Sequence, residues 1–213
     1  MKKTICILFL SIIIPFLCFS QKKDEKAIRK TFEKYKKAVI NDNGKQAMKC
    51  IDKETLNYFE ELLENVKKAD SIKLESLPLF TKLMVLTFRH SFSVKEILAF
   101  DTEKLFLYNT EGTMTGKNGI EQVSIGTIAI NGNLANGNQI IYREETHRKL
   151  NFSKENRKWK LNLLQFIPTE DNDKSFIRIV EEDGFTVNEH LFLMLESTNG
   201  KKVSPDIWNP LIK

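Results

Sequence analysis

The feature that most constrains the fold of this chain is a pair of alternating apolar and polar runs between residues 139 and 167. The segment reads QIIYREETHRKLNFSKENRKWKLNLLQFI, and its polar stretch 153–156 has the composition of a turn. We therefore predict a long β-hairpin in which Phe152 faces Arg157. Successive side chains of a strand point to opposite faces, so this register gives the hairpin one apolar face and one charged face.

The two faces of the predicted hairpin differ in composition. The face expected to cover the core consists of Ile140, Tyr142, Glu144, Thr146, Arg148, Leu150, Phe152, Trp159, Leu161, Leu163, Gln165 and Ile167. The face expected in water consists of Ile141, Arg143, Glu145, His147, Lys149, Asn151, Lys158, Lys160 and Asn162. A slip of one residue would bury this second set, so we expect the choice of face to be strongly specified.

The first twenty residues are typical of a secretory signal peptide. Two lysines at positions 2 and 3 precede an apolar run over residues 5–19, which is shorter than the roughly 20 residues of a membrane-spanning helix. The small residues Cys18 and Ser20, at positions −3 and −1 before Gln21, predict cleavage after Ser20. The alternative is a lipoprotein modified at Cys18. We expect an exported protein, periplasmic or extracellular, with no stable membrane insertion after cleavage.

Cleavage of residues 1–20 changes the composition of the chain. The formal net charge falls from +5 to +3, because two lysines leave and no acidic residue does. Only one of three cysteines, Cys50, remains, so no disulfide within the chain can form. The fold must then rest on its hydrophobic core, and a chain near 150 residues already buries roughly two-thirds of its unfolded surface.

Helical periodicity begins directly after the signal peptide. Residues 22–40 place one apolar stripe at spacings of three and four, formed by Ile28, Thr31, Phe32, Tyr35 and Val39. We interpret the opposite, lysine-rich face as a solvated helix surface rather than a patch for a membrane or polyanion, because no aromatic residue is interleaved with the lysines. We expect no nucleic-acid partner.

Further helices are predicted on both sides of the hairpin. Asp52 is expected to cap one helix, and another runs from Ser76 to Arg89 with an inward stripe of Phe80, Leu83, Met84, Thr87 and Phe88. Capping boxes at 93–96 and 186–189 predict two more helix starts. A strand over 122–130 and turns at the two Asn-Gly pairs, 131–132 and 136–137, complete a meander.

Two segments carry a resemblance to a known superfamily. The opening helix AIRKTFEKY at 27–35 and the closing strand RKWKL at 157–161 resemble the nuclear transport factor 2-like, ketosteroid-isomerase-like superfamily. This resemblance implies that a curved sheet wraps helices into a cone with a pocket. The insertion around 71–105 and the tail IWNP resemble exported proteins of Bacteroidetes-type bacteria. No position here aligns with the superfamily's catalytic aspartate or oxyanion tyrosine, so neither role is carried over.

The fold that we predict is α+β. N-terminal helices pack on a curved, mainly antiparallel sheet in one cone-like domain over 21–167, and a helical extension over 168–213 packs on the same domain.

Motifs for metal or nucleophile chemistry are missing from the sequence. The three histidines are far apart, and no G-x-S-x-G or phosphate-binding glycine motif is present. Cys50 is interpreted as a buried structural thiol. We expect no metal and no cofactor.

The candidate ligand-pocket residues are Tyr142, Glu144, Arg148, Trp159 and Gln165. Charged side chains on an apolar face need a partner or a solvent-filled pocket, so Glu144 and Arg148 indicate an ion pair, a ligand site or a register other than the one predicted. We predict a non-catalytic domain that binds a small apolar ligand or a protein partner through the cone. The alternative is an isomerase- or dehydratase-like enzyme with Glu144 as general base. A homodimer is left open.

Overall fold

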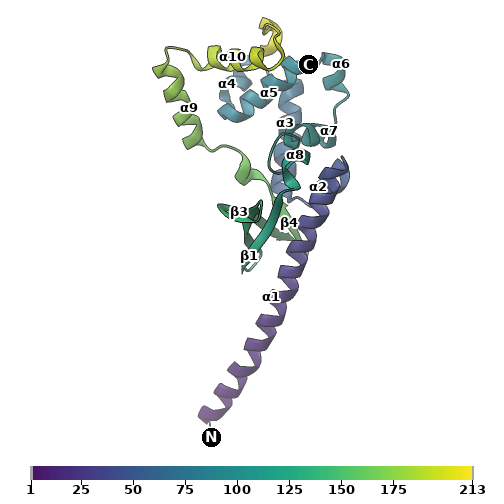
Figure 1. Ribbon diagram of the computed structural model, residues 1–213, viewed down its shortest axis with the longest axis vertical. Coiled ribbons are helices and arrows are strands. Elements are labelled where there is room, and N and C mark those ends of the chain that lie inside the picture. The colour runs from purple at the N-terminus through teal and green to yellow at the C-terminus, as the bar shows by residue number, and fades with distance from the viewer. Residues whose placement is uncertain (1, 213) are drawn as a thin grey trace. The chain divides into compact units, whose positions relative to one another are not determined.

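The computed structural model describes residues 2–212, with side chains from Gln21 onward (Figure 1). The predicted signal peptide, including Cys18 and the cleavage position after Ser20, lies outside the described side chains. The chain is α+β, as predicted, with helices and an antiparallel sheet. From Gln21 to Ile212, where side chains are described, no helix has the combined length and apolar character of a membrane span.

The chain forms two compact units, the first from residues 1–55 and 107–163 and the second from 56–106 and 164–213. The extension expected from residue 168 thus belongs to the second unit. Elements that lie in or begin in the first unit are α1 (Lys2–Ile40), α2 (Gly44–Met48), α3 (Lys53–Lys68), α8 (Lys117–Ile120), β1 (Val123–Asn131), β2 (Leu134–Ile141), β3 (Glu144–Glu155) and β4 (Lys158–Asn162). Those that begin in the second are α4 (Ser71–Ser76), α5 (Leu79–Ser91), α6 (Val94–Leu98), α7 (Thr102–Thr110), η1 (Leu164–Phe166), α9 (Glu170–Glu182), α10 (Val187–Asn199) and η2 (Pro205–Trp208).

The core of the first unit lies between α1 and the sheet. The strands follow the order β1-β2-β3-β4, each antiparallel to the next. The predicted stripe of α1 is confirmed, because Ile28, Phe32 and Tyr35 are fully buried. Irregular pairing within β1–β2 and β2–β3 marks bulges, which bend and twist a sheet. This unit therefore has helices packed on a curved sheet, as expected.

The predicted register of the hairpin is wrong by four residues. Glu155 pairs with Lys158, so the loop is the two-residue turn Asn156-Arg157 instead of the stretch 153–156. Both turn residues have positive φ, 47° and 64°, as a type I′ turn requires. The error is an even number of residues, and the faces are therefore as predicted near this turn, where Leu150, Phe152, Trp159 and Leu161 are buried.

The predicted first strand of the hairpin is in fact two strands. A second turn of the same kind, Tyr142-Arg143 with φ of 51° and 71°, separates β2 from β3. The Asn136-Gly137 pair, expected as a turn, lies inside β2. A Cβ at Gly137 would lie 2.5 Å from Cγ2 of Ile125, so glycine is needed there for close packing between strands.

Each edge of the sheet has a contact from outside the sheet. Arg29 donates to the carbonyl oxygens of Ile125 at 2.6 Å and Gly126 at 2.7 Å, within the irregular part of β1. At the other edge, the backbone of Ile51 forms a parallel bridge with Leu161 of β4. Exposed strand edges invite pairing with other chains, and these contacts occupy them.

The second unit is helical, and its helix starts follow the sequence closely. Both predicted capping boxes, Ser93 with Glu96 and Thr186 with Glu189, are formed. The inward stripe predicted for α5 is right only at Phe88, because the other buried residues are Thr81, Lys82, Val85 and Leu86. This helix carries apolar residues on several sides, so periodicity alone does not identify its buried side.

Candidate ligand pocket

The second unit contains a cavity of about 400 Å³ where the starts of three helices meet. Its lining residues come from the end of α4, the α4–α5 connection, α5, α9 and the start of α10. They are Glu75, Leu77, Pro78, Leu79, Lys82, Asp173, Ile177, Thr186, Val187 and Asn188. Half of these residues are apolar and half are polar or charged, so the pocket can contact both an apolar body and a polar head group.

Lys82 is the buried cation of this pocket. Its side chain is 7% exposed, and its Nζ lies 2.7 Å from Glu75 Oε2 and 3.2 Å from Asn188 Oδ1. The Nζ also lies 5.8 Å from the ring centroid of Trp208. The hydrogen bond from Lys82, supported by one from Asn188, lowers the pKa of Glu75 below its usual value. Lys82 is thus held by partners of this chain, as a buried charge requires.

Asp173 is the second carboxylate of the pocket. It lies in the first turn of α9, and its Oδ2 accepts a hydrogen bond of 3.0 Å from the backbone N–H of Leu79. This contact links the first turn of α9 to the start of α5. No ion pair joins Asp173 to a cation among the described residues.

Some backbone N–H groups at the three helix starts donate to acceptors of the chain. Asp173 accepts from α5, and the side chains of Thr186 and Glu189 cap α10. Asn172 accepts from the backbone of Thr169 at the start of α9. Helix starts attract anions, and these contacts place oxygen acceptors of the chain at the helix starts. The lining formally holds two carboxylates against one lysine, so the pocket favours a donor or a cation.

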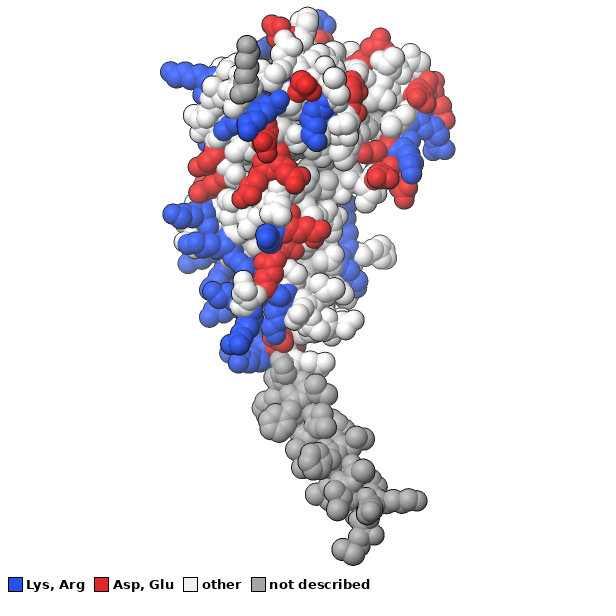
Figure 2. Space-filling view, turned by 180° about the vertical axis from the view of Figure 1, so that it is seen from behind, with Lys and Arg blue, Asp and Glu red and all other residues white. Residues whose placement is uncertain are grey.

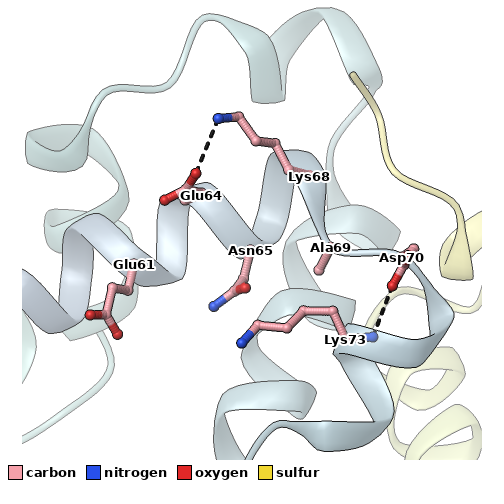
Figure 3. Close-up of a pocket in the computed structure, with 7 residues that line it drawn as sticks. All are labelled: Glu61, Glu64, Asn65, Lys68, Ala69, Asp70 and Lys73. Atoms are coloured by element: carbon pink, nitrogen blue, oxygen red, sulfur yellow. Dashed lines mark hydrogen bonds and ion pairs between the residues drawn. The ribbon is translucent and has the colours of Figure 1, made fainter. Parts of the chain in front are cut away.

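A second hollow, of about 450 Å³, lies between α3 and α4 in the same unit (Figure 3). Glu64 and Lys68 form an ion pair of 3.1 Å on its wall, and Asp70 caps α4 through the N–H of Lys73. In Figure 3 the side chains of Asn65 and Lys73 point into the same space. Only Ala69 adds an apolar surface, so this hollow suits water and ions better than an amphiphilic molecule.

The five sequence-predicted pocket residues differ in burial and in the unit to which they belong. Tyr142 is 73% exposed in the β2–β3 turn, and the side chains of Glu144 and Arg148 on β3 are also exposed. Their expected inward placement is wrong, because Glu144 directly follows the turn at 142–143 and Arg148 lies in the stretch where the pairing of β2 with β3 is irregular. Trp159 is buried, and Gln165 lies in η1 of the second unit.

Contact of these five residues with a ligand stays a prediction, and neither hollow is lined by any of them. The enzymatic alternative with Glu144 as general base likewise stays a prediction. The interpretation of Cys50 as a buried thiol is confirmed, and burial raises its pKa.

Sequence reasoning missed Lys82 and Asp173. A lysine flanked by apolar residues in the segment LFTKLMVLTF was the available signal, because such a lysine needs a buried partner if the helix is covered on that side. Its two partners, Glu75 and Asn188, lie more than a hundred residues from each other in the sequence, so spacing could not show that Lys82 contacts both.

Comparisons with protein-family models, with curated proteins and with solved structures find no match. The resemblance to the nuclear transport factor 2-like superfamily therefore stays a prediction.

Proposed function

We propose that this protein is an exported, non-catalytic binding protein, and that the pocket around Lys82 holds a small amphiphilic molecule with a cationic head group. The sequence led us to expect a ligand in the cone of the sheet. In the structure, however, the aromatic side chains of α1 pack between that helix and the sheet. Support for a binding site falls instead on the cavity of the second unit.

The observation that carries this proposal is the charge of the pocket lining. Glu75 and Lys82 compensate each other, which leaves Asp173 as the carboxylate without an ion-pair partner among the described residues. A cationic head can approach Asp173 while its apolar body contacts Pro78 and Ile177. The second unit as a whole carries twelve Lys and Arg against seventeen Asp and Glu, which also attracts cations.

The proposal of a non-catalytic role follows from how the polar groups are engaged. A nucleophilic lysine must lose its proton, but Lys82 lies in hydrogen-bond contact with a carboxylate that stabilises its charged form. Asp173 is bound to a backbone N–H, and the lining contains no histidine or cysteine. The arrangement fits orientation and charge matching of a ligand better than proton transfer.

Calorimetric titration with three probes of equal chain length tests this function. Octylamine, octanol and octanoate share an apolar body and differ in the charge of the head. We expect octylamine to bind most tightly and octanoate least tightly. Equal binding of the three probes, or preference for octanoate, would contradict the proposal.

A pair of matched variants locates the site. Asp173→Asn removes the charge but keeps an oxygen that can accept from Leu79, so the fold should persist. Asp171→Asn removes the same charge from the same helix turn, at an exposed residue outside the lining. Octylamine affinity should fall about tenfold in the first variant and stay unchanged in the second, since a lost charged contact changes binding by about 1.4 kcal/mol or more.

Export is tested separately by N-terminal sequencing of the protein from its native envelope fraction. The signal-peptide prediction expects a chain that begins at Gln21. An intact Met1, or a lipid on Cys18, would contradict that prediction and leave the pocket untouched.

A further inference from the structure

The side of α1 that faces away from the core is a continuous band of lysine. At 100° per residue, the buried residues Ile28, Phe32, Tyr35 and Val39 cluster around one direction. The opposite arc, about 120° wide, contains a set of residues that we call the lysine face. It consists of Lys22, Lys23, Lys26, Lys30, Lys34 and Lys37, with Glu33 as its one acidic residue.

All six lysines of this face are exposed, and none forms an ion pair within the described part of the chain. The other acidic residues of the helix are already engaged. Glu25 pairs with Arg29 at 2.9 Å, and Asp24 pairs with Lys154 at 2.7 Å. The lysine face therefore presents a formal excess of five positive charges without local compensation. Figure 2 shows Lys and Arg side chains gathered along the lower left of the molecule.

The positive excess of the protein is confined to the unit that carries this face. Without residues 1–20, the first unit has nineteen Lys and Arg against eleven Asp and Glu, whereas acids predominate in the second unit. The face extends from Lys22 to Lys37, about 22 Å along the helix at 1.5 Å per residue. The charges form a band along the outer surface of the helix, and neither of the described hollows lies along this band.

The chemistry of this line favours one kind of anionic partner. It contains lysine only, a flexible point charge, and no arginine, the residue that forms paired hydrogen bonds with single phosphates in nucleic acid. No exposed aromatic side chain lies among the lysines for bases to stack on. Clustered lysines on a helix are how proteins are attracted to membranes rich in anionic lipid, and the apolar stripe of α1 is buried in the core and cannot insert.

We propose, in place of the solvated surface expected from the sequence, that the lysine face of α1 docks this protein reversibly on a bilayer surface rich in anionic phospholipid. The contact is electrostatic, involves no insertion of apolar side chains, and weakens with salt. It is independent of the pocket in the second unit.

Vesicle co-sedimentation of the protein, purified as the cell processes it, tests this proposal. The vesicles are phosphatidylcholine alone or phosphatidylcholine with phosphatidylglycerol at about one lipid in three, at low and physiological ionic strength. We expect binding to the anionic vesicles only, with affinity falling as salt rises. The triple variant Lys26→Gln, Lys30→Gln, Lys34→Gln should weaken binding about 100-fold, because each lysine near such a surface contributes about fivefold.

Two matched variants separate the lysine face from net charge. Lys95→Gln, Lys174→Gln, Lys201→Gln removes three exposed lysines of the second unit and should bind as the natural protein does. Replacing Lys26, Lys30 and Lys34 by arginine keeps the charge and should preserve binding. All of these positions are exposed, and circular dichroism verifies folding.

Four results would overturn the proposal. They are a failure to bind anionic vesicles, an equal loss in both glutamine variants, binding that is unaffected by salt, and binding to an oligonucleotide without binding to vesicles. Sedimentation velocity provides a further arm, because concentration-dependent dimers that disappear in the Lys26, Lys30, Lys34 glutamine variant, without vesicle binding, would assign the face to a second copy of the chain instead.

Discussion

Arg89 is predicted to hold the second unit together, and its replacement should be the most destabilising single change on the surface of α5. Its guanidinium donates four hydrogen bonds to backbone carbonyls. The acceptors are Asn65 at 3.1 Å, Val66 at 2.9 Å, Ala69 at 2.7 Å and Ile207 at 2.9 Å. Three of these carbonyls belong to the last turn of α3 or directly follow it, where most carbonyls have no helical N–H partner, although Asn65 also accepts from the N–H of Ala69.

The magnitude follows from the number of bonds. Burial lowers the pKa of Arg89 to about 10, so the group remains charged at neutral pH. A hydrogen bond contributes about 1 kcal/mol net, and more when one partner is charged. Arg89→Met keeps most of the aliphatic stem and removes all four bonds, which should cost about 4 kcal/mol. At a denaturant slope of about 2 kcal/mol per molar, the urea midpoint should fall by about 2 M.

Urea denaturation of three variants provides the assay. Arg89→Lys supplies a single ammonium, so it should recover only part of the loss. Arg178→Met is the control, because this arginine is 73% exposed in an ion pair of 3.9 Å and should change stability by less than about 0.5 kcal/mol. Hydrogen exchange at Ile207 should also accelerate in Arg89→Met. A midpoint for Arg89→Met equal to that of Arg178→Met would refute the reasoning.

Three further predictions concern the first unit and are measured by the same urea denaturation. Trp159→Ala should cost about 3–5 kcal/mol because the ring is buried, whereas Lys158→Ala on the exposed face should change little; equal losses would mean that the strand faces are inverted. Gly137→Ala should cost about 1–3 kcal/mol because its Cβ would collide with an isoleucine of β1, while Gly112→Ala meets nothing within 4 Å and should be near neutral; a harmless Gly137→Ala would contradict the strand packing. Burial raises the pKa of Asp24, but hydrogen bonds from its lysine and tryptophan partners outweigh burial and lower the pKa below its usual value. The stabilisation by the ionised carboxylate is therefore present above the unfolded pKa and is lost as pH falls through the folded pKa. The stability difference between the natural protein and Asp24→Asn should therefore be full at pH 7 and shrink toward pH 3, and a pH-independent difference would show that the ionised carboxylate is not what matters.

The sequence predicted those elements whose signal is local. Both expected capping boxes and the buried stripe of α1 depend on residues within one or two helical turns of each other, and they are as predicted. The end of α10 at Gly200 also depends on a local signal, because glycine readily adopts the left-handed conformation, with φ of 70°, in which this helix ends. The apolar face of the hairpin near its turn was also predictable, because a period of two survives a register error of four.

The elements that sequence reasoning missed depend on non-local packing. The turns at Tyr142-Arg143 and Asn156-Arg157 place four non-glycine residues at positive φ. Asn-Gly is the usual sequence signal for a turn with this conformation. The Asn136-Gly137 pair is typical of such a turn but lies within a strand, because an isoleucine of β1 packs where a Cβ of Gly137 would be. The pocket was invisible for a similar reason, since Lys82 meets partners from α4 and α10 only after the helices pack.

The location of a bound amphiphile is the most direct test of the central claim that this is a binding protein with its site in the second unit. Methyl-labelled protein titrated with octylamine and followed by NMR distinguishes the two sites that the sequence and the structure favour. We predict shifts at the methyl groups of Leu79, Ile177 and Val187, which line the pocket, and none at Leu150 and Leu161 in the core beneath the sheet. Shifts confined to the sheet, or no saturable shift at any methyl group, would contradict the account.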